Sequence, residues 1–316
     1  MTDERRALVT GGAGFIGSHL VDALLDRGWK VSILDDLSTG RYANLPKSAA
    51  IRFFEGSVLN PAKVSEAMSG VDTVFHLAAS VSVPFSVDHP EPSFRTNANG
   101  TLNVLEAARL AGVRRFVYSA SSARYGDRPD SPKSEHIAPQ ALSVYAAGKL
   151  AGEELVEAYS HSYDMEAISL VYFNVFGPRQ RPDSPYAAVI PIFASRMLAG
   201  QPITIHGDGE QTRDFTYVSN VVEANLLAAD AAMLKGQAVN VAGGESISVN
   251  RLVAEMSNLL GKEAKVVHGP PRAGDVRYSS ADISDAKRVL GYEPRITWQV
   301  GLKLTIDSMR ESTQES

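Results

Sequence analysis

The sequence predicts an α/β protein with a doubly wound parallel sheet and a smaller C-terminal lobe. Short apolar runs alternate with apolar patterns at helical spacing through the first half of the chain, which is typical of parallel strands covered by helices on both faces. A glycine cluster directly follows the first apolar run, and from about residue 178 the loops become longer. We therefore predict a first domain over residues 1–177, to which residues 215–244 return, and a second lobe over 178–316.

The elements of the first domain follow in order. Strands are expected at Ala7–Val9, Val31–Leu34, Ile51–Phe54, Thr73–Leu77, Arg115–Ser119 and, after the chain returns, Ala238–Ala242. Helices are expected from Ile16 to Gly28, Pro61 to Met68, Asn97 to Ala111 (with Leu102, Leu105, Ala108 and Leu110 as its apolar face) and Tyr145 to Ser160. In the second lobe Ser248, Ser284 and Thr297 each begin a helix, the last fraying from Glu311.

The glycine cluster has the spacing of a dinucleotide-binding turn. Gly11, Gly14 and Gly17 lie between a strand and a helix, where a tight turn, a close approach to pyrophosphate and helix packing exclude a side chain. The helix N-terminus offers unpaired N–H groups to the phosphates. Asp35 ends the next strand, 18 residues past Gly17, and suits an acceptor for the adenosine ribose. Because a carboxylate there repels a 2′-phosphate, this Rossmann pattern predicts NAD rather than NADP.

Composition limits the classes of partner. The formal net charge of −5 argues against a general surface for nucleic acid or anionic membrane. The sequence contains no run of 18 apolar residues and no signal-peptide core. Zero cysteines exclude disulfides and thiolate chemistry and suit a cytoplasmic protein. We predict no metal site.

A tyrosine and a lysine supply the candidate chemistry. Tyr145 and Lys149 stand at i and i+4, so they share one face of a helix. An ammonium beside a phenol favours the phenolate, which makes the tyrosine a candidate general base. Ser121 and Ser122 follow a strand that should open into the same cleft, and Ser121 precedes Tyr145 by 24 positions. A serine hydroxyl there can hold the substrate oxygen that the tyrosine deprotonates.

These motifs in this order resemble the extended short-chain dehydrogenase/reductase superfamily. The set comprises Thr10-Gly-Gly-Ala-Gly-Phe-Ile-Gly17, Ser121, Tyr145-x-x-x-Lys149 and Tyr172-Phe-Asn-Val-Phe-Gly-Pro178. Within it, the chain resembles the NAD-dependent UDP-sugar 4-epimerases over almost its whole length. The resemblance implies tightly bound NAD, a 4-keto sugar intermediate, and a homodimer. It makes Tyr145 the acid/base, Lys149 the group that lowers its pKa and binds the nicotinamide ribose, and Ser121 the group that orients the sugar.

The resemblance and the strand ends together give the candidate binding residues. Those for the cofactor are Gly11, Gly14, Phe15, Ile16, Gly17, Asp35, Asp36, Ser38, Thr39, Gly40, Ser57, Val58, Leu77, Ala78, Ala79, Ser80, Asn97, Ser119, Tyr145, Lys149 and Tyr172. Those for the UDP-sugar are Ser82, Ser121, Ser122, Asn174, Tyr186, Ala188, Val189, Arg213, Arg277 and Ser279. Asn174, Arg213 and Arg277, with Arg272 as a possible third arginine, are expected at the diphosphate.

The identity of the sugar depends on a few positions. Ser279 aligns with a gate at which, in this family, a bulky residue confines the site to glucose and galactose and a small one admits a 2-acetamido group. We therefore expect interconversion of UDP-GlcNAc and UDP-GalNAc, with UDP-Glc and UDP-Gal as possible further substrates. Arg181 matches a residue that grips the carboxylate in UDP-glucuronate 4-epimerases, which makes glucuronate the alternative.

Two departures from the family pattern are left without an assigned role, one other reaction is disfavoured, and one alternative function stays open. Ser57 stands where many relatives have an aspartate near the adenine, and Ala123-Arg124 occupy a stretch that is usually apolar or hydroxyl-bearing, so the role of Arg124 is unassigned. No acidic residue lies between Ser121 and Tyr125, which disfavours a sugar 4,6-dehydratase. A non-catalytic nucleotide-sensing protein on the same fold is the alternative of a different class.

Overall fold

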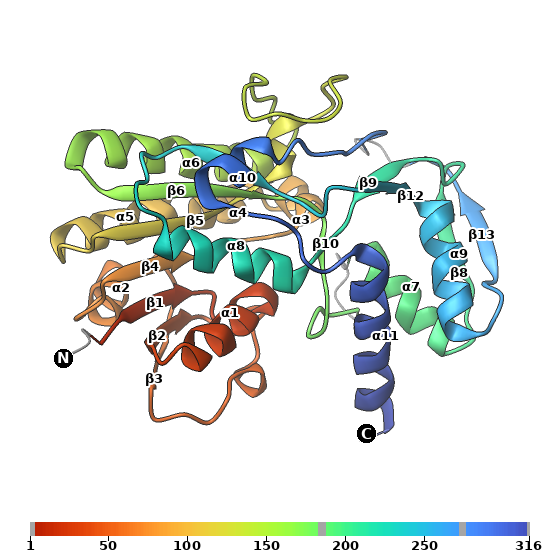
Figure 1. Ribbon diagram of the computed structural model, residues 1–316, viewed down its shortest axis with the longest axis horizontal. Helices are drawn as coiled ribbons and strands as arrows, with labels where there is room; N and C mark the ends of the chain where they lie inside the picture. The colour runs from red at the N-terminus through yellow and green to blue at the C-terminus, as the bar shows by residue number, and fades with distance from the viewer. Residues whose placement is uncertain (1–3, 183–187, 272–275, 315–316) are drawn as a thin grey trace.

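The central feature of the structure is a seven-stranded sheet in which every pair of neighbours is parallel. The computed structural model describes residues 4–182, 188–271 and 276–314 (Figure 1). The strands are β1 (Arg6–Thr10), β2 (Lys30–Asp35), β3 (Ile51–Glu55), β4 (Thr73–His76), β5 (Arg115–Ser121), β6 (Glu166–Tyr172) and β11 (Ala238–Val241). Their order is β11-β6-β5-β4-β1-β2-β3, so the order reverses between β1 and β4, where such sheets bind ligands. The predicted fold class is confirmed.

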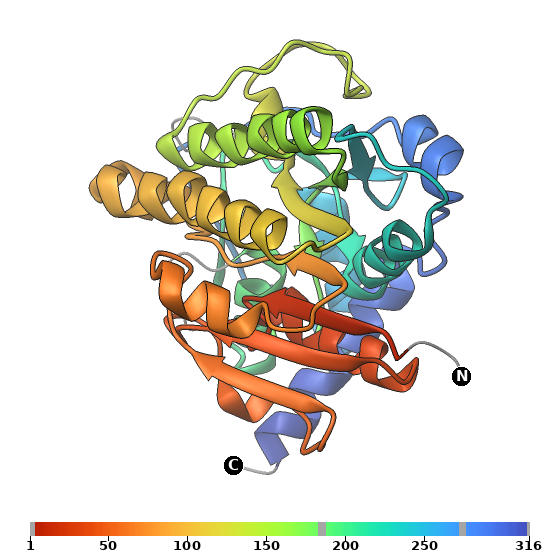
Figure 2. The ribbon, with the colours of Figure 1, turned by 90° about the vertical axis from the view of Figure 1, so that its left-hand side faces the viewer.

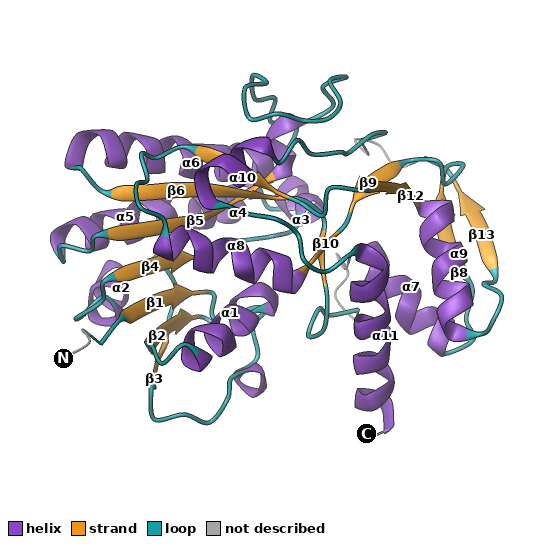
Figure 3. Cartoon of the chain, in the orientation of Figure 1, coloured by secondary structure: helices purple, strands orange, loops and turns teal. Residues whose placement is uncertain are grey.

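Helices cover both faces of this sheet (Figure 3). One face packs against α1 (Phe15–Asp26), α8 (Val218–Asp230) and α10 (Ser284–Leu290). The other packs against α2 (Pro61–Ala67), α5 (Gly100–Leu110) and α6 (Val144–Tyr163). Figure 2 shows α5 and α6 running side by side on that face. Shorter helical segments at the loops are α3 (Val83–Asp88), α4 (Pro90–Phe94), a π-helix (Arg95–Asn99) and 3₁₀ turns at Tyr42–Asn44 and Ser122–Tyr125.

The remaining elements form what we call the C-terminal lobe, at the right of Figure 1. Its helices are α7 (Val189–Leu198), α9 (Val249–Leu260) and α11 (Trp298–Gln314). Its strands pair as β7 (Val175–Phe176) with β10 (Thr216–Tyr217), β8 (Ile203–His206) with β13 (Val266–Gly269), and β9 (Thr212–Asp214) with β12 (Ser246–Ser248). The lobe has an apolar core of its own, built around residues such as Phe193, Leu252 and Leu302.

Some predicted details differ from the structure. In α5, Leu105 and Ala108 are buried, but Leu102 and Leu110 are 38% and 71% exposed, because the helix turns that face away from the sheet. The last helix continues through Glu311 to Gln314 instead of fraying there. Ser284 does begin α10 as predicted, although the N-cap position is held by Ile283, which makes no side-chain cap. Across the described residues, no helix is both long enough and apolar enough to cross a bilayer.

Candidate active site

The glycine turn after β1 is built so closely that side chains are excluded. The Gly11 N–H donates to the Leu34 carbonyl at 2.8 Å, and Gly11 has a φ of +68°. A Cβ at Gly11 would lie 2.8 Å from the Ala78 nitrogen, and a Cβ at Gly17 would lie 2.2 Å from the Gly11 oxygen. Gly14 is the N-cap of α1 and has no side chain to cap the first N–H groups. This bare cradle fits a pyrophosphate at a helix N-terminus.

The two carboxylates at the end of β2 lie beside this turn. Asp35 is buried and accepts N–H bonds from Ala13 at 2.9 Å and Leu37 at 2.8 Å. Burial raises the pKa of Asp35, while those two bonds lower it. Asp36 accepts from both the N–H and the hydroxyl of Ser38, at 3.0 and 2.6 Å. A carboxylate held by the backbone of the turn itself would repel a phosphate on a ribose bound beside it.

The loop after β4 is fixed from both sides. The Ala78 N–H donates to the Thr10 hydroxyl at 3.2 Å, which ties this loop to the end of β1. The Asn97 side chain accepts from the Ser80 N–H at 2.8 Å and donates to the Ser80 carbonyl at 3.0 Å. The Ser82 hydroxyl caps α3 by accepting from Phe85 at 3.0 Å. Asn97 therefore acts on this loop through Ser80, which sequence spacing could not show.

His76 is a buried residue that the sequence reasoning missed. Its Nε2 lies 3.0 Å from the Thr101 hydroxyl and its Nδ1 lies 2.7 Å from the Thr10 hydroxyl. Thr101 already donates to the Asn97 carbonyl at 2.6 Å, so its oxygen must accept from an Nε2–H. Burial, with Lys149 as a second cause, lowers the pKa of His76 to about 3. A neutral histidine in one tautomer thus joins β1, β4 and α5.

Tyr145, Lys149 and Ser121 meet where β5 ends against the first turns of α6. A side-chain hydrogen bond joins Tyr145 to Ser121; burial raises the pKa of Tyr145 and this bond opposes the rise. Lys149 is 4% exposed, and its Nζ lies 4.5 Å from the centroid of the Tyr118 ring. Burial lowers the pKa of Lys149 to about 7. Ser122 begins the 3₁₀ turn in which the Ser121 hydroxyl accepts from Ala123 at 3.2 Å.

A cavity of about 520 Å³ opens from the C-terminal lobe beside β7. It gathers four predicted residues in one place, and these are Asn174, Ala188, Val189 and Arg213. Phe176, Phe193 and Phe215 contribute to its apolar wall. An apolar cavity with an amide and a guanidinium at its side has the character of a ligand site.

Ser279 is adjacent to this group. The Asn174 amide donates to the Asp214 carbonyl at 3.1 Å and to the Ser279 hydroxyl at 3.4 Å. The Ser279 N–H in turn donates to the Thr212 carbonyl at 3.2 Å. The backbone of β9 therefore holds the Asn174 side chain and the Ser279 backbone, and the predicted gate residue contacts a predicted substrate residue.

Other predicted residues are engaged elsewhere. Arg277 makes two bonds to Asp208, at 2.7 and 2.9 Å, which lower the pKa of Asp208 to about 2. Tyr172 is buried, and its hydroxyl accepts from the Asn225 amide at 2.8 Å and also bonds Ser119. Tyr186 and Arg272 lie outside the described residues.

The remaining predicted cofactor residues make contacts of several kinds. The Ser57 hydroxyl accepts from Leu59 at 3.2 Å, and the Val58 carbonyl accepts from the Asn103 amide at 3.0 Å. The Leu77 N–H donates to the Thr10 carbonyl at 3.1 Å. Four further residues are partly buried or exposed, and these are Phe15, Ile16, Thr39 and Ala79. Gly40 is buried, and a Cβ at this position would lie 2.9 Å from an Asp35 oxygen.

Comparison with known proteins agrees with this geometry. The model of the NAD dependent epimerase/dehydratase family matches residues 7–242. A UDP-glucose 4-epimerase of Mycolicibacterium smegmatis is 40% identical, with 98% of this chain and 100% of that protein covered. The structure of a UDP-N-acetylglucosamine 4-epimerase from Methanobrevibacter ruminantium, in complex with UDP-N-acetylmuramic acid, has a TM-score of 0.94 at 38% identity, covering 98% and 99%.

A second similar structure holds the cofactor. It is a UDP-glucuronic acid 4-epimerase from Bacillus cereus in complex with UDP-glucuronic acid and NAD, with a TM-score of 0.90 at 32% identity, covering 97% of this chain and 99% of the other. The chain belongs to the NAD dependent epimerase/dehydratase family and, within it, to the NAD-dependent UDP-sugar 4-epimerases.

Proposed function

We propose that this epimerase interconverts UDP-GlcNAc and UDP-GalNAc, and also accepts UDP-Glc and UDP-Gal. The observation that carries the proposal is the small side chain of Ser279 in contact with Asn174 beside the cavity. A serine there leaves room that a tyrosine would fill, and a 2-acetamido group needs that room. The relative from Methanobrevibacter ruminantium, named for an N-acetyl sugar, supports this choice.

In this proposal three side chains carry the proton chemistry. Tyr145 removes the proton of the sugar 4-hydroxyl and returns it to the 4-keto intermediate after the sugar has turned over. Ser121, which bonds Tyr145, orients the same oxygen. Lys149 supplies a positive charge next to the phenol. NAD⁺, when bound, supplies a reversible acceptor for the carbon-4 hydride and a positive ring that favours the phenolate.

The nucleotide end of the substrate requires a firm grip so that the sugar end can turn. We propose that Asn174 and Arg213 bind the diphosphate and that Ala188 and Val189 line the uracil, supported by their shared cavity. A planar guanidinium suits bidentate binding of phosphate oxygens. Arg277 is proposed as a second arginine there, which requires it to exchange Asp208 for the diphosphate.

The test is a product assay over UDP-GlcNAc, UDP-Glc and UDP-glucuronate with purified protein and no added NAD. Turnover of UDP-GlcNAc supports the proposal, and turnover of UDP-glucuronate alone would replace it. No turnover of any pair by protein that retains NAD would favour the non-catalytic alternative.

The gate is tested by Ser279→Tyr, with Ser279→Ala as the matched control that keeps the side chain small. Ser279→Tyr should lower kcat/KM for UDP-GlcNAc at least tenfold more than for UDP-Glc, while Ser279→Ala should change the ratio less than threefold, in line with what pocket shape contributes. An equal loss on both sugars in Ser279→Tyr would refute the gate.

UDP-glucuronate is the second candidate because Arg181 lies in the Gly177-Pro-Arg-Gln-Arg181 motif and the Bacillus cereus relative is named for that sugar. An arginine is the residue type that binds a carboxylate in a bidentate manner. If this candidate holds, Arg181→Gln should lower kcat/KM for UDP-glucuronate and leave UDP-Glc unchanged.

We further propose a cytoplasmic homodimer that associates through α5 and α6. The absence of cysteine suits a reducing compartment. These helices lie side by side and expose Leu102, Leu110 and Tyr163, the last 52% exposed. Light scattering coupled to size exclusion should give twice the chain mass of 33.9 kDa, and Leu110→Lys should shift it towards the single chain.

A further inference from the structure

A buried ion pair lies close to the proposed acid/base and has no role in the function above. Arg124, in the 3₁₀ turn that follows Ser121, contacts the Glu153 carboxylate on α6. Their side chains are only 8% and 9% exposed. The Arg124 carbonyl also accepts from Gln140 at 2.7 Å, so this turn is fixed on both its backbone and its side chain.

The pair belongs to a series of contacts between the same two elements. Tyr145, Lys149 and Glu153 lie on successive turns along one face of α6. Facing them from the end of β5 and its turn, Ser121 bonds Tyr145, and the Tyr118 hydroxyl donates to the Lys149 carbonyl at 3.1 Å. Arg124 to Glu153 is the contact furthest along the helix. The contacts at Tyr145 and at Glu153 lie on either side of Lys149 along the helix, and together they limit how far α6 can slide or rotate against β5.

Stability alone does not account for this arrangement. Removing two charges from water costs several kcal/mol per ion, and apolar residues of similar size often serve the fold equally well. The Arg124 Nε is buried and, among the described residues, has no hydrogen-bond partner, which adds to the cost. Burial raises the pKa of Glu153 to about 7, with Glu154 and Glu157 contributing, while Arg124 opposes the rise. Compared with apolar packing, an ion pair fixes the direction and the distance between the two side chains that form it.

We propose that Arg124 and Glu153 are positioning residues whose ion pair holds the end of β5 against α6 and thereby sets the distance between the Ser121 hydroxyl and the Tyr145 phenol. The inference rests on the proposed role of Tyr145 as the acid/base. Misplacing a catalytic group by about 1 Å can cost on the order of 100-fold in rate, so the effect should appear in kcat. Substrate affinity should change little, because neither Arg124 nor Glu153 lines the cavity, which draws on β7 and the C-terminal lobe.

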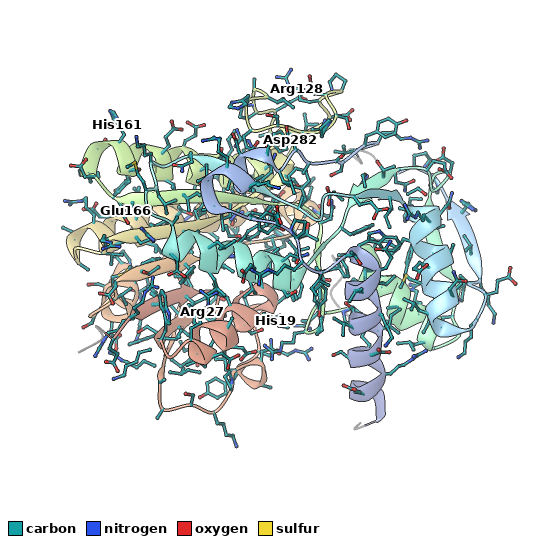
Figure 4. The ribbon with its side chains drawn as sticks, in the orientation of Figure 1. His19, Arg27, Arg128, His161, Glu166 and Asp282 are labelled. Atoms are coloured by element: carbon teal, nitrogen blue, oxygen red, sulfur yellow. The ribbon has the colours of Figure 1, made fainter. Side chains whose placement is uncertain are left out.

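The experiment is a double-mutant cycle of Arg124→Met, Glu153→Gln and both together, on the full chain with NAD bound. The matched control is Arg115→Met. Like Arg124, Arg115 is a buried arginine in an ion pair, but it is the first residue of β5 and pairs with Glu166, which Figure 4 labels at the other end of the strands. Stability is measured by urea unfolding, and kcat and KM are measured on the sugar pair that the wild type turns over.

Each single variant at Arg124 or Glu153 is expected to lower kcat at least tenfold with KM within threefold. The double variant should regain stability, since no unpaired charge remains, but not kcat. Arg124→Lys should recover part of kcat because it retains the charge. Arg115→Met should lose stability with kcat unchanged.

Two outcomes would overturn the inference: kcat of Arg124→Met within twofold of the wild type, or full recovery of kcat in the double variant, which would assign the loss to an unpaired charge. If a variant fails to fold, the inference is tested by kcat of Arg124→Lys and by the coupling free energy that urea unfolding gives for the variants that do fold. Lack of wild-type turnover would instead refute the proposed function, and the coupling in stability would still report on the pair.

Discussion

The surroundings of Tyr145 set the protonation state of its phenol. Burial raises the pKa of its phenol and the bond with Ser121 only partly opposes this, so the protein's own groups favour the neutral form at pH 7. Burial likewise lowers the pKa of Lys149 to about 7. If Tyr145 is the base, as proposed above, added positive charge from bound NAD⁺ and from Lys149 is needed to favour its phenolate.

Tyr145→Phe should therefore remove the proton transfer and little else. We expect kcat to fall by roughly 100- to 10,000-fold, the range that general acid–base catalysis contributes. The NAD content after purification and the melting temperature should remain close to those of the wild type, because the ring stays in place. A variant that keeps more than a tenth of the activity would assign the base to another residue.

His76 gives a prediction about pH. Its pKa is about 3 in the folded chain, and an unfolded histidine titrates near 6.5. Between these values the unfolded chain binds a proton that the folded chain does not, so stability falls as pH falls from about 6.5. The contribution amounts to about 2 kcal/mol between pH 7 and pH 5.

His76→Gln should lower stability at pH 7 but reduce the further loss at pH 5, as measured by urea unfolding at both values. His161→Gln is the control, because His161 is exposed on α6 (Figure 4) and should change neither value. The same acid-induced loss in His76→Gln and the wild type would refute this assignment.

At the scale of elements, two glycines of α6 allow this helix to pack closely against its neighbours. A Cβ at Gly152 would lie 2.2 Å from the Tyr118 hydroxyl oxygen, and one at Gly148 would lie 2.9 Å from the Asn97 Cβ. Both glycines are buried inside the helix, where glycine costs about 1 kcal/mol relative to alanine. In return, α6 lies in close contact with β5 at Gly152 and with the π-helix at Gly148.

Gly152→Ala should consequently destabilise the protein by about 1–3 kcal/mol, the usual range for overpacking, despite the better helix propensity of alanine. It should also lower kcat, since α6 carries Tyr145. Ala158→Gly on the exposed face of α6 should cost about 1 kcal/mol and leave kcat unchanged. Thermal and urea unfolding measure the first effect; a more stable Gly152→Ala variant would refute it.

Elements were predictable to different degrees, for physical reasons. Buried parallel strands read as apolar runs, so β1, β2, β4 and β5 could be located from sequence. The exposure of Leu102 and Leu110 could not be predicted, because a helical pattern of apolar residues does not show which neighbouring element covers each of them. His76 had a signal that we did not use: a polar residue inside a buried strand requires a partner, and Thr10 lies opposite it in the register of β1 with β4.

Of the candidate site, the residues that belong to local motifs were the predictable ones. The glycine turn and the spacing of Tyr145 and Lys149 are fixed by a few consecutive residues. The pairing of Asn97 with Ser80, of Arg277 with Asp208 and of Arg124 with Glu153 joins segments far apart in sequence. Spacing alone carries no information about such pairs.

At the scale of the whole molecule, ligand removal tests the cofactor preference. Ligand at about 100 times its Kd adds about 2.7 kcal/mol to stability, so stripping NAD should lower the Tm by about 5 °C. Returning NAD should restore the Tm. NADP at the same concentration should restore less, because Asp35 repels the 2′-phosphate. Equal restoration by both, measured by scanning calorimetry, would contradict the assignment.

The connection between the sheet and the C-terminal lobe has a mechanical consequence. The chain leaves the sheet after β6 and returns for α8 and β11, then leaves again for β12 and α9 and comes back with α10 before α11 ends in the lobe. The sheet domain and the C-terminal lobe are thus connected by several crossings of the backbone and not by a single linker. A protease that nicks one crossing would release neither half, and the cut protein should still migrate as one particle on a native gel.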